Sequence, residues 1–163
     1  MKKIIFPIIG AALFIVAVGI LMQKTSFLSS TPTPQPTETK PTVTIDSKVI
    51  SVEIAKTNEE REKGLSDVAS LEANSGMLFV FDDGGKIPTF WMKGMIMPID
   101  ILWISDGKII RIDKNVPAPT PNTPDSKLKT YSAGRPVNYV LEMTAGFSDS
   151  NSIKVGDSVS FSN

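Results

Sequence analysis

Two acidic side chains stand out in the sequence because each one interrupts an apolar segment: Asp100 and Glu142. A carboxylate among hydrocarbon neighbours costs several kcal/mol unless a cation or a hydrogen-bond donor lies nearby. Lys93 is the nearest basic residue to Asp100 in sequence, and Trp91 lies two positions before it. We therefore expect a ligand-binding site made of Trp91, Lys93, Asp100 and Glu142, in which the indole offers a stacking surface to a sugar or another flat ligand.

The two carboxylates also have other interpretations. Asp100 could form a structural ion pair, or accept hydrogen bonds from backbone amides in a turn. Asp100 and Glu142 could act together as an acid/base pair on a glycosidic bond, which requires about 5 to 9.5 Å between them. The chain has no His and no Cys, which excludes the Ser-His-Asp triad, thiol nucleophiles and the common zinc sites. We assign no catalytic residue.

Three methionines follow the same aromatic block with the spacing Met-x-x-Met-x-Met. Met92, Met95 and Met97 carry thioether sulfur, a soft ligand that suits Cu(I). Methionines at the end of an apolar strand more often fill a protein core. We therefore expect neither a metal site nor a cofactor, and these three residues are the weak candidates for copper.

The N-terminal part of the sequence is typical of a membrane anchor. Residues 4–22 are nineteen amino acids without a charge, and as a helix they would span the hydrocarbon core of a bilayer. Lys2 and Lys3 precede this run, so the positive-inside rule predicts that residues 1–3 are cytoplasmic and that the C-terminal domain is extracytoplasmic. The run is longer than the core of a cleaved signal peptide, which favours a retained transmembrane signal-anchor helix. The lipid bilayer is therefore one expected partner.

A stalk and a folded domain follow this anchor. Residues 23–41 are rich in Pro and Thr and lack aliphatic and aromatic side chains from residue 29 onward, which predicts a disordered stalk. Residues 42–163 contain thirteen Lys and Arg against sixteen Asp and Glu, a net charge of minus three. Because no block of basic residues is present, we expect no nucleic-acid partner.

The sequence from residue 42 onward predicts many short strands and two short helices. Thr57 and Glu60 form a capping box before a helix over 57–64, and a second helical turn is expected at 145–151. Asp106-Gly107 predicts a hairpin turn, and four prolines predict a long loop over 116–130. The expected strands cover 49–55, 77–81, 89–93, 99–105, 109–112, 138–143 and 158–162. The predicted fold is mostly β (β-rich α+β): a small antiparallel or mixed β-barrel with two short helices, preceded by one transmembrane helix.

The strand over 99–105 should have two different faces, because side chains alternate along a strand. One face would carry Ile99, Ile101 and Trp103, and the other Asp100, Leu102 and Ile104. By the same rule, Glu142 should lie opposite its neighbours Leu141 and Met143. If 89–93 pairs antiparallel with 99–105, Lys93 and Asp100 lie near the same end of the sheet.

Five blocks of the C-terminal domain occur in an order that points to a known family. They are Met77-Leu78-Phe79-Val80-Phe81, Phe90-Trp91-Met92-Lys93, Pro98-Ile99-Asp100-Ile101, Tyr139-Val140-Leu141-Glu142 and Lys154-Val155-Gly156-Asp157. Over about residues 47–160 the chain resembles the family of domain of unknown function 192. The resemblance implies a compact β-rich fold, frequently an extracytoplasmic position, and no established activity. Many members carry a Cys pair in the loop that is 117–130 here, and this chain lacks it.

These features together predict a membrane-anchored, extracytoplasmic ligand-binding or interaction module at the cell envelope. Its ligand would be an envelope glycan or a protein. One alternative is a glycan hydrolase that uses Asp100 and Glu142, and another is a purely structural envelope protein. The position of the two carboxylates relative to a pocket distinguishes the three.

Overall fold

The computed structural model describes residues 40–81 and 87–162 of the chain. The predicted anchor at 4–22 and nearly all of the predicted stalk lie outside these described residues. Within the described ranges, no helix is both long enough and apolar enough to cross a membrane.

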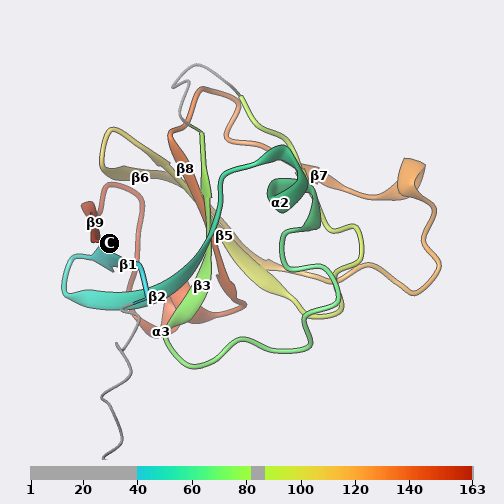
Figure 1. The fold of residues 1–163 in the computed structure, drawn as a ribbon, viewed down its shortest axis with the longest axis horizontal. Coiled ribbons are helices and arrows are strands. Elements are labelled where there is room, and N and C mark those ends of the chain that lie inside the picture. The colour runs from blue at the N-terminus through green and yellow to red at the C-terminus, as the bar shows by residue number, and fades with distance from the viewer. Residues whose placement is uncertain (1–39, 82–86, 163) are drawn as a thin grey trace, which may run out of the picture. The chain divides into compact units, whose positions relative to one another are not determined.

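A curled, seven-stranded sheet forms a half-barrel (Figure 1). Its strands are β1 (Thr42–Ile45), β2 (Lys48–Ala55), β3 (Ser75–Val80), β5 (Ile99–Ser105), β6 (Lys108–Val116), β8 (Tyr139–Thr144) and β9 (Val159–Ser162). Their order across the sheet is β6-β5-β8-β3-β2-β1-β9. The pairing is antiparallel except between β2 and β3. The sheet is therefore mixed, and its two ends approach each other at a bridge between Lys108 and Ser158.

A second, two-stranded sheet lies apart from the half-barrel. In it, β4 (Phe90–Trp91) pairs antiparallel with β7 (Thr130–Tyr131). The condition considered above, that 89–93 pairs with 99–105, is therefore not met. The reason is that β5 is already hydrogen-bonded to β6 on one edge and to β8 on the other, so no edge is free for a further strand.

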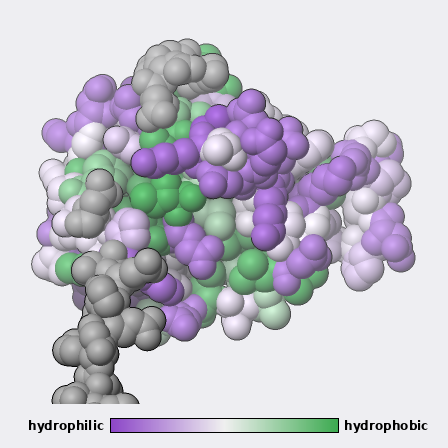
Figure 2. Space-filling model, in the orientation of Figure 1, coloured by the Kyte–Doolittle hydropathy of each residue, from purple (hydrophilic) through white to green (hydrophobic). Residues whose placement is uncertain are grey.

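Both predicted helices are present. α2 (Asn58–Lys63) begins with the expected capping box between Thr57 and Glu60, and it ends at Gly64, where φ is +47°. α3 (Phe147–Ser150) is a single turn, and a 3₁₀ turn, η1 (Asp125–Lys127), interrupts the proline-rich loop. α2 has no buried residue, and Figure 2 shows a hydrophilic surface over it.

The two faces of β5 belong to two different cores, and this confirms the predicted alternation. The inner core fills the curl of the sheet and includes Leu102, Ile104, Leu141 and Met143. The outer core covers the other face and includes Phe79, Ile99, Ile101, Trp103 and Val140. Because both faces are covered, all of Ile99–Ile104 is buried. The outer core is the layer on which α2 and β4 lie.

Candidate ligand-binding site

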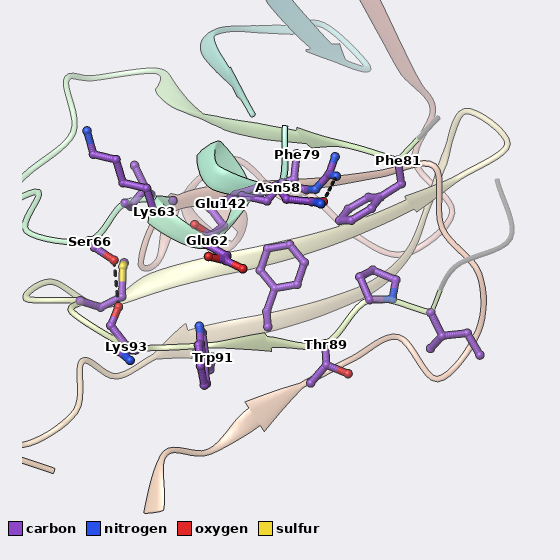
Figure 3. A pocket seen from close by; sticks show the side chains of 17 residues that line it. Asn58, Glu62, Lys63, Ser66, Phe79, Phe81, Thr89, Trp91, Lys93 and Glu142 are labelled. Atoms are coloured by element: carbon purple, nitrogen blue, oxygen red, sulfur yellow. Dashed lines mark hydrogen bonds between the residues drawn. The ribbon is translucent and has the colours of Figure 1, made fainter. Parts of the chain in front are cut away.

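A pocket of about 520 Å³ opens between α2 and the segment that contains β4. Figure 3 shows α2 on one side, Thr89 and Trp91 on the other, and Glu142 behind them. The pocket lining includes Arg61, Glu62 and Lys63 of α2, Phe79 and Phe81, the segment with Phe90, Trp91, Lys93 and Met95, and Glu142 of β8. This α2–β4 pocket has the volume of a typical small-molecule site.

Two hydrogen bonds to backbone carbonyl oxygens join the walls of the α2–β4 pocket at one end. The Ser66 hydroxyl donates a hydrogen bond to the carbonyl oxygen of Lys93 at 2.9 Å. The Asp67 amide donates one to the carbonyl oxygen of Gly94, also at 2.9 Å. Gly94 has φ +70°, and a Cβ built there would lie 3.0 Å from the Ser66 side chain. Glycine is therefore needed at this junction for both conformation and space.

An aromatic cluster forms the apolar part of the pocket. Phe90 packs edge-on against Phe79 and Trp103, with ring centroids 4.9 and 5.4 Å apart. The Arg61 guanidinium lies 5.3 Å from the centre of the Phe81 ring, and it donates a hydrogen bond to the Val80 carbonyl oxygen at 2.8 Å. Since α2 buries no residue of its own, this arginine is a main attachment of the helix to the sheet.

Glu142 places a carboxyl group among these apolar residues. It lies opposite Met77 of β3 and Ile101 of β5 in the sheet register, and only 5% of its surface is exposed. In the described part of the chain, no group donates a hydrogen bond to this carboxyl. Burial raises the pKa of Glu142 to about 8, so in the empty pocket the group is largely protonated at neutral pH.

Trp91 and Lys93 lie at the rim of the pocket. Trp91 is 46% exposed, and the Lys93 ammonium lies 5.3 Å from the centre of its ring. The same ammonium pairs with the Asp125 carboxylate at 2.6 Å. An ion pair with Lys93, one of the alternatives considered for Asp100, is therefore not formed. The cation is held by the proline-rich loop instead.

Asp100 lies outside the α2–β4 pocket, on the inner face of the sheet. It is fully buried, and one oxygen accepts hydrogen bonds from the amides of Asn115 (2.8 Å) and Gly146 (3.1 Å). The other oxygen accepts one from the amide of Ser148 at 2.9 Å. Of the interpretations set out for Asp100, the structure shows the carboxylate bound by backbone amides. This carboxylate joins β5 to β6 and to the start of α3.

The sheet register separates Asp100 from Glu142. Asp100 lies opposite Met143, whereas Glu142 lies opposite Ile101. Directly opposed residues share a face and successive residues alternate, so the two carboxyl groups project from opposite faces of one sheet. They cannot act on the same glycosidic bond. The alternative prediction of a glycan hydrolase that uses Asp100 and Glu142 was therefore wrong.

The three methionines pack in the outer core. Met92, Met95 and Met97 are 4%, 6% and 6% exposed, which is the packing role that such methionines commonly have. Met95 also lines the α2–β4 pocket. Among residues 40–81 and 87–162, no cluster of three His, Cys, Asp or Glu forms a candidate metal site.

The structure thus brings three of the four expected site residues to one pocket: Trp91, Lys93 and Glu142. The sequence analysis did not select Arg61, Glu62, Phe79 or Phe90 as site residues. The capping box predicts the helix that carries the first two, but no local pattern indicates that this helix lies across from β4.

Two solved structures resemble this fold. One is described as a "putative transcription regulator" from Sinorhizobium meliloti 1021; it is 29% identical, has a TM-score of 0.65, and the match covers 76% of this chain and 94% of that one. The other is a protein of unknown function from Novosphingobium aromaticivorans DSM 12444, 28% identical with a TM-score of 0.63, covering 81% of this chain and 94% of that one. No curated protein matched.

A family model also matches the chain, and it agrees with the resemblance carried by the five sequence blocks. The model is DUF192, described as an uncharacterized ACR, and it matches residues 41–161. The matched range contains every strand and helix of the described domain except Ser162, the last residue of β9. The chain therefore belongs to the DUF192 family.

Proposed function

We propose that this domain is a binding module that takes a ligand into the α2–β4 pocket. The observation that carries this proposal is the buried carboxyl group of Glu142, which faces the pocket without a described hydrogen-bond partner. Polar groups with so little exposure are normally hydrogen-bonded, and because no donor is described in the protein, the partner must come from the pocket, as water or as a ligand. A ligand that hydrogen-bonds to Glu142 would supply what the protein does not.

A purely structural role explains Glu142 less well. This chain satisfies a buried carboxylate with backbone amides where one serves the fold, as the three donors to Asp100 show. An apolar residue at position 142 would fill the outer core at a lower cost in free energy. The aromatic lining and the exposed Trp91 at the rim also suit a ligand with an apolar part.

We further propose that the module works at the cell envelope, held by a membrane anchor at residues 4–22. The uncharged run, the two lysines before it and the Pro- and Thr-rich segment at 23–41 support this location. The ligand would then be an envelope glycan, a protein or a small molecule. The net charge of minus three in residues 42–163 argues against a nucleic-acid ligand.

Methionine methyl NMR on the full chain in a mild detergent tests the binding proposal. Met95 lines the pocket, whereas Met143 lies in the inner core on the other side of the sheet. A panel of glycans, peptides and small amphipathic molecules should contain members that shift the Met95 methyl signal and leave that of Met143 in place. If no member of the panel shifts Met95 at millimolar concentration, the proposal is wrong.

A further inference from the structure

We propose that the ligand group seated against Glu142 is an ammonium carried on an apolar arm, as in a lysine side chain or an arylalkylamine. This inference rests on the proposed binding function and names the chemical class of its ligand. It stands on the charges and the ring surfaces that line the α2–β4 pocket.

Two of the three cations that line the pocket, Lys93 and Arg61, have partners in the protein, and the third is Lys63 of α2. Lys93 pairs with Asp125. The Arg61 guanidinium donates to the Val80 carbonyl oxygen and to the Asn58 side chain, each at 2.8 Å. An anionic ligand would meet the Glu62 carboxylate, and among the described lining cations only Lys63 has no hydrogen-bond or ion-pair partner. An ammonium ligand would find two carboxyl groups, Glu62 and Glu142.

The aromatic lining favours the same ligand class. Ring faces carry negative electrostatic potential and attract cations within about 6 Å of the ring centre. The pocket already shows this preference at Trp91, where the Lys93 ammonium lies 5.3 Å from the ring centre. Phe79 and Phe90 line the same pocket as Glu142. A carboxylate beside aromatic rings is a suitable environment for an organic cation with an apolar arm.

Binding of an ammonium should release a proton. Glu142 is largely a neutral acid at pH 7; with the ammonium bound the carboxylate is favoured, so one proton leaves Glu142 for solvent while the ligand keeps its own. Met77 and Ile101, the direct neighbours on β3 and β5, carry no charge. The charged groups that surround this position are Glu53 on β2, Arg61, Glu62 and Lys63 on α2, Lys93 after β4, and Asp113 on β6.

The test compares three probes of similar shape on the full chain: 2-phenylethylammonium, 2-phenylethanol and 3-phenylpropionate. Calorimetry at pH 6, 7, 8 and 9 in two buffers of different ionisation enthalpy reports affinity and proton release. We expect the ammonium to bind best, with affinity rising about tenfold per pH unit below pH 8 and levelling above it. About one proton should be released per ligand at pH 7.

Two matched variants separate Glu142 from the general acidity of the pocket. Glu142→Gln keeps the shape of the side chain and removes its charge, so it should abolish the preference for the ammonium, the pH dependence and the proton release. Glu62→Gln removes an exposed carboxylate of α2, and it should lower affinity less than threefold and keep the pH dependence. Thermal unfolding of each variant shows that it is folded.

Three outcomes would overturn the inference. If the alcohol or the carboxylate probe shifts the Met95 methyl signal and binds as tightly as the ammonium, the ligand class is wrong and the binding function stands. If Glu142→Gln binds the ammonium as tightly as the natural protein does, the carboxyl is not its receptor. If no probe and no member of the wider panel shifts the Met95 methyl signal, both the proposed binding function and the proposed ligand class are wrong.

Discussion

Two buried carboxyl groups, Asp100 and Glu142, lie on neighbouring strands of one sheet and have opposite environments. Asp100 faces the inner core and accepts three backbone hydrogen bonds. Glu142 faces the outer core and a pocket, and burial holds its pKa near 8. Burial in an apolar strand thus does not identify a binding residue. What separates the structural carboxylate from the candidate site is the number of donors that the fold supplies.

Removing Asp100 should have the largest effect on stability. Asp100→Ala leaves the amides of Asn115, Gly146 and Ser148 buried without their acceptor, so we expect a loss of about 5 kcal/mol in the free energy of unfolding. Urea denaturation measures it. Asp149→Asn, which alters an exposed carboxylate of α3 paired with Lys114, should cost less than about 1 kcal/mol. Equal losses in the two variants would remove the structural role assigned to Asp100.

Glu142 should make stability depend on pH in a defined direction. Its pKa is raised from 4.5 to about 8 in the folded protein, so the native state holds this proton more tightly than the unfolded chain does. The free energy of unfolding should therefore fall by about 5 kcal/mol as pH rises from 4.5 through 8, and level off above that.

The control for this pH effect is Glu142→Gln. Urea denaturation at pH 5, 7 and 9 on both proteins should show the natural protein losing stability relative to the variant as pH rises. A constant difference between the two across this range would mean that Glu142 is ionised in the folded protein and has partners of its own.

Gly94 lies where the two walls of the pocket meet, and its replacement should destabilise the protein. Gly94→Ala puts a Cβ 3.0 Å from Ser66 in a residue with φ +70°, so it should cost about 2 kcal/mol. Gly134→Ala has the same φ, and no atom lies within 4 Å of the added Cβ, so it should cost about 1 kcal/mol. Thermal denaturation compares the two. If both variants lose the same stability, the contact between Ser66 and Gly94 does not constrain the pocket wall.

The Lys93–Asp125 ion pair should matter least. Its side chains are 52% and 57% exposed, and exposed pairs contribute little. Asp125→Asn should lower the free energy of unfolding by less than about 1 kcal/mol, measured by urea denaturation. The effect should shrink further in 1 M salt, where the Debye length is about 3 Å. A loss above 2 kcal/mol would show that this exposed ion pair stabilises the fold as strongly as a buried one.

Local sequence patterns predicted much of the local structure. The capping box at Thr57 and Glu60 predicted α2, the Asp106-Gly107 turn predicted the β5–β6 hairpin, and the alternation in Ile99–Ile104 predicted the two faces of this strand, which pack into the two cores. These features depend on residues a few positions apart, where the spacing of side chains is fixed by the geometry of the helix or the strand.

Features that depend on contacts between distant residues could not be predicted from local sequence patterns. The pairing of β4 with β7 joins segments about forty residues apart, and β7 is only two residues long at the end of a proline-rich loop. Asp100 receives its donors from Asn115, Gly146 and Ser148, which are neighbours only after the sheet has formed. The sequence could therefore select Asp100 and Glu142 as unusual, but it could not show which of the two was satisfied.

A ¹³C NMR titration of the Glu142 carboxyl carbon shows whether this carboxyl lacks a partner in the protein and meets the ligand. The signal can be assigned by its absence in Glu142→Gln, and the full chain is titrated with and without saturating 2-phenylethylammonium. An unpartnered carboxyl in an empty pocket should titrate near pH 8, and an ammonium ligand should move the midpoint below pH 6. A midpoint near 4.5 in both titrations would contradict this account, because Glu142 would then be an ordinary, already satisfied carboxylate.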